Sequence, residues 1–124
     1  MNLADTNVVV SLLLPSRGEQ HREAASFVRE HGPLEVGEAV LAECCWVLER
    51  RYRMKRGDIA SLLRGALNTD QLTAWDPALV DRALDLMECL PRLSVVDCLL
   101  LSRSFDGHSV LTFDRRPQRA LEGL

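Results

Sequence analysis

The apolar residues of this chain fall into short continuous runs and longer stretches with helical spacing. Short runs bounded by turn-forming residues predict buried strands, and spacings of three and four predict amphipathic helices. The predicted strands are residues 2–4, 34–36, 71–75 and 109–113. The predicted helices are residues 8–14, 19–31, 38–53, 58–67, 77–90 and 94–104.

Short apolar strands that alternate with helices are typical of a parallel sheet whose two faces are both covered. The fold class is therefore expected to be α/β, with a four- or five-stranded, mainly parallel sheet flanked by helices on both faces. A fifth strand would have to come from the tail, and residues 115–124 look short for a further unit. At 124 residues the chain is expected to form one domain, residues 1–124.

Composition places the chain among soluble globular proteins, with 47% hydrophobic and 27% charged residues. No apolar run approaches the roughly 18 residues that a membrane span needs, and the first residues lack a basic leader. We therefore expect a cytoplasmic protein that makes no membrane contact. The four cysteines, Cys44, Cys45, Cys89 and Cys98, have no zinc-site spacing and are expected to be small buried side chains.

Charge alone does not identify a partner. Fifteen bases and 18 acids give a net charge of −3, so there is no overall positive field. Lys55 is the only lysine, so all the other bases are arginines. Arginine binds phosphate well, which would favour a nucleic-acid partner. A GC-rich genome explains the preference for arginine over lysine equally well. The basic run of Arg50, Arg51, Arg53, Lys55 and Arg56 is either a solvated helix end or a contact for nucleic-acid backbone. Trp46 and Trp75 are expected in the core or an interface rather than as base-stacking platforms.

Four acids are candidates for chemistry. Asp5 and Asp114 follow the first and last predicted strands, and ligands bind beyond the carboxyl ends of strands in open α/β sheets. Either aspartate alone is also a common turn former or helix cap. Glu43 is enclosed by apolar residues and is expected near the buried stripe of its helix, where an unpaired carboxylate is costly. Asp97 lies in the first turn of a helix, whose dipole by itself favours an acid there.

If these four acids converge, they repel one another unless a positive charge holds them together. A hard divalent cation is the simplest partner, because a site rich in oxygen ligands suits Mg²⁺ or Mn²⁺ and not zinc. Water on such an ion serves in phosphodiester hydrolysis. With the four acids assigned to metal, fourteen acids remain against fifteen bases, so the rest of the surface is nearly neutral.

The ordered set of Asp5-Thr6-Asn7, Glu43, Asp97 and Thr112-Phe113-Asp114 resembles the PIN domain, and in particular the VapC-type toxins of type II toxin–antitoxin modules. The resemblance covers essentially the whole chain. It implies an endoribonuclease that depends on Mg²⁺ or Mn²⁺ and cuts RNA with an activated water. It also implies a homodimer, and a small antitoxin that inserts a C-terminal segment near the acids.

The resemblance implies a role for each matched residue. Asp5, Glu43, Asp97 and Asp114 would be the catalytic metal ligands, direct or through water. Asp5 and Asp97 would be innermost, with Glu43 as a general base or second-layer acceptor. Asn7 would orient Asp5 or a ligand water, and Thr112 would support Asp114.

The chain departs from the pattern at Arg116, where many relatives carry an acid or amide. This arginine either weakens a second metal site or, with Arg115, contacts RNA phosphates. A degenerate PIN domain that binds RNA or protein without cutting is the alternative. A phosphoryl-transfer enzyme of the haloacid-dehalogenase or receiver type fits poorly, because Asn7 replaces a required second aspartate and Lys55 follows the wrong strand.

Overall fold

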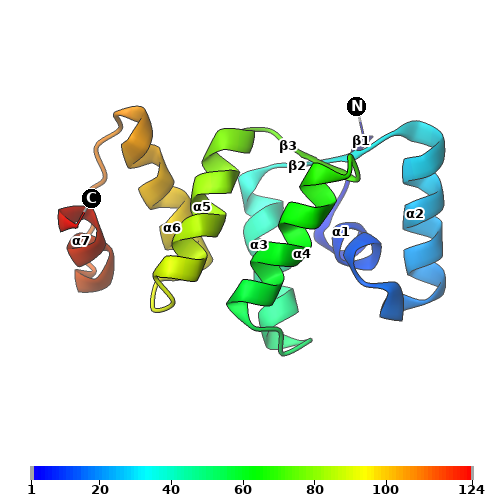
Figure 1. The fold of residues 1–124 in the computed structure, drawn as a ribbon, viewed down its shortest axis with the longest axis horizontal. Coiled ribbons are helices and arrows are strands. Elements are labelled where there is room, and N and C mark those ends of the chain that lie inside the picture. Colours follow the sequence, from blue (N-terminus) through cyan, green and yellow to red (C-terminus); the bar gives the residue numbers. More distant parts are fainter. Residues whose placement is uncertain (1, 124) are drawn as a thin grey trace.

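Seven α-helices and three short β-strands make up the computed structural model over residues 2–123, the part of the chain that it describes (Figure 1). The elements are β1 (Asn2–Leu3), α1 (Thr6–Leu13), α2 (Glu19–His31), β2 (Leu34–Val36), α3 (Glu38–Arg50), α4 (Arg56–Asn68), β3 (Leu72–Ala74), α5 (Pro77–Cys89), α6 (Val95–Ser102) and α7 (Arg115–Glu122). Two 3₁₀ turns, Pro15–Arg17 and Arg103–Asp106, extend the ends of α1 and α6.

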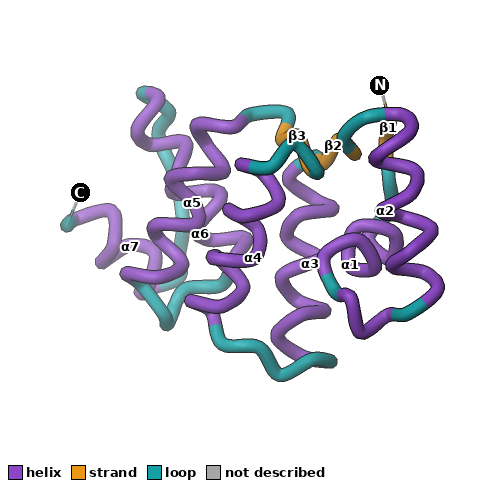
Figure 2. The backbone as a smooth tube through the Cα atoms, turned by 45° about the vertical axis from the view of Figure 1, so that its right-hand side comes forward, coloured by secondary structure: helices purple, strands orange, loops and turns teal. Residues whose placement is uncertain are grey.

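The three strands pair in parallel in the order β1-β2-β3, as Figure 2 shows near one edge of the molecule. Leu34 pairs with Asn2 and with Leu72, which fixes the register. Leu34 and Leu72 are buried. The next pairing level of the sheet carries Leu3 on β1 and Thr73 on β3, and both are exposed. Because successive residues of a strand face opposite sides, the helices bury one face of this sheet and leave the other open.

Two expectations about the sheet are therefore not met within residues 2–123. Helices do not cover both faces, and the predicted strand 109–113 does not join the sheet. That segment has no regular secondary structure, and Leu111 and Phe113 are 84% and 92% exposed. Its alternating sequence favours a strand, yet a strand forms only where a partner edge lies beside it. The tail forms helix α7 and supplies no fifth strand.

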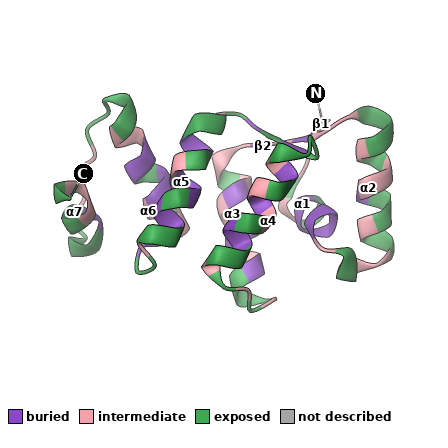
Figure 3. Ribbon diagram, viewed as in Figure 1, coloured by how far each residue is buried: buried purple, intermediate pink, exposed green. Residues whose placement is uncertain are grey.

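The core lies where α3, α4, α5 and α6 pack together, in the middle of Figure 3. Its largest fully buried side chains include Leu48, Ile59, Leu63, Leu79 and Leu101. Each of these helices places apolar residues at spacings of three and four, which puts them on one face of the helix. Helix α3 is central, because it packs against α1, α4 and α6.

Polar side chains at the N-terminal ends of four helices fix where those helices begin. Asp5, Asp76, Ser94 and Asp114 each accept a hydrogen bond from a backbone N–H of the first turn of α1, α5, α6 and α7. Such caps satisfy donors that have no partner within the helix. Helix α4 begins at Arg56, two residues before the predicted start at 58, so Asp58 lies in its first turn.

Within residues 2–123, no helix combines the length and apolar character needed to cross a bilayer. The four cysteines are free thiols. Cys44, Cys45 and Cys98 are buried, as expected. The same expectation is wrong for Cys89, the last residue of α5, which is exposed.

The packing predicts unequal effects for two leucine truncations. Leu63→Ala removes a fully buried side chain of α4 and should lower the free energy of unfolding by about 2–5 kcal/mol. Leu111→Ala removes an exposed side chain and should change it by less than about 0.5 kcal/mol. Urea denaturation followed by circular dichroism measures both values. A loss for Leu111→Ala as large as that for Leu63→Ala would show that the 109–113 segment is packed in solution.

Candidate functional site

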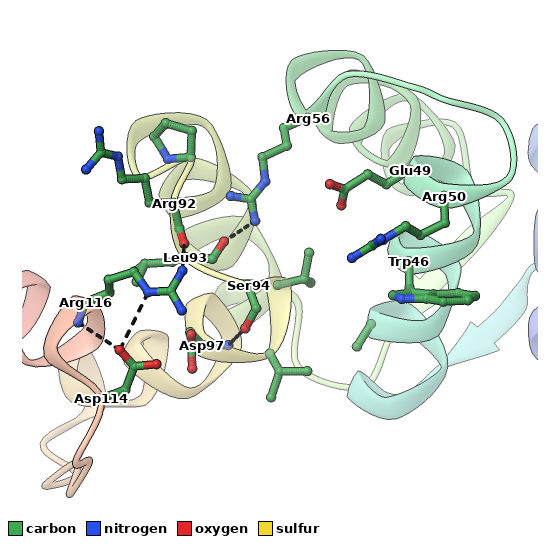
Figure 4. A pocket seen from close by; sticks show the side chains of 14 residues that line it. Trp46, Glu49, Arg50, Arg56, Arg92, Leu93, Ser94, Asp97, Asp114 and Arg116 are labelled. Carbon is green, nitrogen blue, oxygen red and sulfur yellow. Dashed lines mark hydrogen bonds and ion pairs between the residues drawn. The ribbon is translucent and has the colours of Figure 1, made fainter.

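The four acids expected at the site divide between two clefts and the central helix. Asp97 and Asp114 line a cleft of about 510 Å³ between α3, α6 and the start of α7, shown in close-up in Figure 4. Asp5 lines another cleft of about 530 Å³, between the end of β1, α1 and α2. Glu43 lies on α3, which packs against both α1 and α6.

Asp97 is the third residue of α6 and is partly buried. The hydroxyl of Ser94 caps the helix and accepts a hydrogen bond of 3.0 Å from the Asp97 backbone N–H. The unpaired N–H groups of this first turn carry partial positive charge, which stabilises a nearby carboxylate. Local structure thus explains why an acid is tolerated here, while its carboxylate lines the cleft (Figure 4).

Asp114 caps α7 and is held from both sides along the chain. Its carboxylate accepts a hydrogen bond of 2.9 Å from the Arg116 backbone N–H, and its own N–H donates to Thr112 Oγ1 at 3.1 Å. The Arg116 side chain folds back, with Nε 3.7 Å from the Asp114 carboxylate. Asp114 follows residues 109–113, which form no strand of the sheet, so its expected position at the sheet edge is wrong. It nevertheless reaches the cleft that Asp97 lines.

Asp5 caps α1 by accepting a hydrogen bond of 3.0 Å from the Val8 N–H, and it is exposed. Asn7, expected to orient Asp5 or a ligand water, accepts a hydrogen bond from the Arg17 guanidinium through its side-chain oxygen. Arg17 also donates to Tyr52 Oη at 2.8 Å. Sequence patterns gave no signal for Arg17 and Tyr52, because 35 positions separate them and only the fold brings them together.

Glu43 is exposed, so its expected place beside the buried stripe of α3 is wrong. The buried face of α3 instead carries Leu41, Cys44, Cys45 and Leu48. Burial, with smaller contributions from the neighbouring Cys45, Glu43 and Asp5, raises the pKa of Cys44 to about 12. The Cys44 thiol also approaches the Thr6 carbonyl at 3.9 Å. Glu43 and Asp5 therefore both lie near one point of the contact between α3 and α1.

The donor set fits a hard divalent cation in its chemistry, because all four candidates are carboxylates. Within residues 2–123, however, no three Asp, Glu, His or Cys side chains lie close enough to hold one metal ion together. The structure places Asp97 and Asp114 on the wall of one cleft, and Asp5 and Glu43 near the contact between α1 and α3. It does not join the two pairs in one cluster.

The arginines near the cleft lined by Asp97 and Asp114 differ in what they contact. Arg56 donates to the backbone carbonyls of Leu90 (3.2 Å) and Leu93, so it ties α4 to the loop before α6. Arg50 and Arg92 line the cleft, are exposed, and form no ion pair within the described part of the chain.

The other residues expected to contact RNA fall into two groups. Arg116 lines the cleft, and its guanidinium also approaches the Arg92 carbonyl at 3.4 Å. Arg51 and Arg115 are exposed but are not among the side chains that line it.

Both tryptophans are exposed, so neither occupies the core, one of the two kinds of position expected for them. Trp46 is 54% exposed and lines the cleft of Asp97 and Asp114 from α3. Trp75 is 65% exposed, and its ring lies so close to Gly37 that an added Cβ there would come within 2.7 Å of it.

A family model described as PIN domain matches residues 3–123, a span that contains all four acids. No curated protein and no solved structure matches the chain.

Burial predicts that the cysteines of the site region are inert thiols. The pKa values are raised to about 12 for Cys44 and Cys45 and to about 11 for Cys98, mainly by burial. At pH 8 the native protein should therefore react rapidly with Ellman's reagent at one thiol, Cys89, and at all four once unfolded. Cys89→Ser should abolish the rapid phase. Rapid reaction of the Cys89→Ser protein at two or more thiols would contradict the packing of α3 against α1 and α6.

Proposed function

The chain belongs to the PIN domain family, whose members are generally nucleases, and from this premise we propose that it is a metal-dependent endoribonuclease. The single observation that carries the proposal is the cleft in which Asp97 and Asp114 lie among arginines. Carboxylates can hold a divalent cation, and guanidinium groups bind phosphate. A cleft lined by both suits the hydrolysis of a phosphodiester.

Asp5, Glu43, Asp97 and Asp114 would hold the ion, Mg²⁺ or Mn²⁺, directly or through water. When bound, such an ion supplies a water of lowered pKa and stabilises the charge that develops on the phosphate. Because the two acid pairs stand apart, binding would require α1, α3 and α6 to bring their carboxylates closer. Neutralising the repulsion between the carboxylates would favour that approach.

The remaining residues of the cleft would position the RNA. Arg50 and Arg92 have free guanidinium groups at the rim and would contact phosphates on either side of the scissile bond. Arg116 is paired with Asp114 and would exchange that carboxylate for a substrate phosphate. Thr112 and the α7 backbone hold Asp114 in place through the hydrogen bonds described above.

We further propose that the chain is the toxin of a toxin–antitoxin pair, active as a homodimer and inhibited by a small antitoxin protein. The support is the ordered acid pattern of the sequence together with the family match over residues 3–123. A partner that blocks the cleft would need an arginine or lysine to meet Asp97, because a buried carboxylate without a partner is costly.

A second candidate is a catalytically degenerate PIN domain that binds RNA or protein without cutting. Two observations favour it: the absence of a three-donor cluster within residues 2–123, and the pairing of Arg116 with Asp114. The same variants separate the two candidates, because only a nuclease loses a cleaving activity when its acids are changed.

Asp97→Asn should reduce RNA cleavage in Mg²⁺ or Mn²⁺ by roughly 100-fold or more, because it removes a charge that would hold the ion. Asp58→Asn is the matched control, since Asp58 is the third residue of α4 as Asp97 is of α6, but lies outside the cleft. Cleavage of a fluorescent oligoribonucleotide by purified protein gives the rates, and chelator should stop the wild type.

Growth after induced expression gives an independent test in cells, with arrest expected for wild type and Asp58→Asn but not for Asp97→Asn. Equal cleavage by the Asp97→Asn and wild-type proteins would contradict the proposed nuclease. Binding of RNA without any cleavage by the wild type would instead support the degenerate domain.

Two neighbouring arginines should separate an RNA contact from a structural role. Arg50→Ala should weaken RNA binding and lower the slope of log affinity against log salt concentration by about one. Its free energy of unfolding should equal that of the wild type. Arg56→Ala should instead destabilise the protein by about 1–3 kcal/mol, because two carbonyls lose their charged donor. Fluorescence anisotropy at several salt concentrations and urea denaturation measure the two effects. The reverse pattern would contradict these assignments.

A further inference from the structure

The side chain of Trp46 is placed in an unusual way for a large aromatic residue of a central helix. Its neighbours Cys45 and Leu48 are almost completely buried, whereas the Trp46 side chain is 54% exposed. An indole that contacts water forgoes the free energy it would gain in a core or an interface. Val96, which lines the same cleft, is 62% exposed as well, so apolar surface gathers at this cleft, where a bound ligand would cover it.

The surroundings of Trp46 point to the kind of ligand. The ring lines the cleft together with Asp97, Asp114, Arg50 and Arg92, and Figure 4 shows it beside Arg50, across the cleft from Asp97. The volume of about 510 Å³ lies within the range of small-molecule sites and accommodates a nucleotide-sized group. The cleft thus offers an apolar ring for a base and free guanidinium groups for its phosphates.

We propose that Trp46 is a substrate-positioning residue: an unpaired base of the RNA stacks on its ring, across the cleft from Asp97. This inference rests on the proposed nuclease function and names a residue that positions its substrate. Proteins that bind single strands combine a positive groove with aromatic platforms, because every base has a face that can stack. Bases inside a duplex are already stacked and paired, so they do not offer that face.

Arg50 supports the same assignment, because it lies four residues after Trp46 and therefore on the same side of α3. It forms no ion pair within residues 2–123 and is free to meet a phosphate next to the stacked base. Trp75 makes an informative contrast. Its ring lies over Gly37 next to Glu38 and Asp76, which both pair with Arg103, and no arginine of the described residues is among the side chains that line this pocket.

The chain has two tryptophans, so each can be observed alone. Trp75→Phe leaves Trp46 as the only indole, and Trp46→Phe leaves Trp75. Each protein is titrated with a single-stranded oligoribonucleotide, and with the same strand in a duplex, in EDTA so that no cleavage occurs. We expect saturable quenching by the single strand in Trp75→Phe and none in Trp46→Phe. The duplex should bind more weakly.

Affinity gives the second readout. Trp46→Ala should bind the single strand roughly 5-fold to 100-fold more weakly than wild type, which is the effect of losing one stacked base. Trp46→Phe should bind with an affinity between those of Trp46→Ala and wild type. Trp75→Ala should bind as wild type does. Circular dichroism and urea denaturation check that each variant folds, which the exposure of both rings favours.

Two outcomes would overturn the inference: unchanged affinity in Trp46→Ala, or Trp46 emission that follows protein concentration and not RNA, which would assign the ring to a protein interface. The test is separate from that of the nuclease itself. If the wild type cleaves RNA and Trp46→Ala binds it normally, only the stacking proposal fails. If no cleavage occurs but Trp46 is quenched by the single strand, the nuclease proposal fails and the stacking surface stands.

Discussion

The packing of α3 between α1 and α6 is the contact on which the rest of the molecule depends. Its buried face must hold Leu41, Cys44, Cys45 and Leu48 against neighbours on several sides. A helix that buries this much of its surface has one strip left for solvent. That strip carries Glu43, Trp46 and Arg50, and core packing thereby directs Trp46 and Arg50 to the cleft that Asp97 lines.

The acids around α3 are compatible with the fold because backbone dipoles and caps stabilise them. Asp5 and Asp114 cap their helices, and Asp97 lies in a first turn, where partial positive charge offsets a carboxylate. Glu43 has no such support and stays exposed. The fold therefore spreads these carboxylates over different elements or pairs them with arginine, as in Asp114 with Arg116. A divalent cation would neutralise the repulsion between these carboxylates, and so would favour an arrangement in which they lie closer together.

Sequence patterns predicted the local features well because their causes are local. Helix α2 and strand β2 have the predicted bounds, since Gly32 and Pro33 separate a clear helical period from a short apolar run. Features that depend on distant partners were predicted poorly. Residues 109–113 have a strand-like sequence but no paired edge beside them in the structure, and Trp46 has a core-like residue type on an exposed strip. The four acids were identifiable by type, yet their grouping into two pairs depends on how α1, α3, α6 and α7 pack.

We propose that Asp5, which caps α1, and Asp97, on α6, would hold one metal ion across α3. Titration of Mn²⁺ followed by the electron paramagnetic resonance signal of the free ion tests it without relying on catalysis. Wild type and Asp58→Asn should bind Mn²⁺ saturably with equal affinity, while Asp5→Asn and Asp97→Asn should each bind at least about 10-fold more weakly. Binding by both of these variants with wild-type affinity would contradict the account.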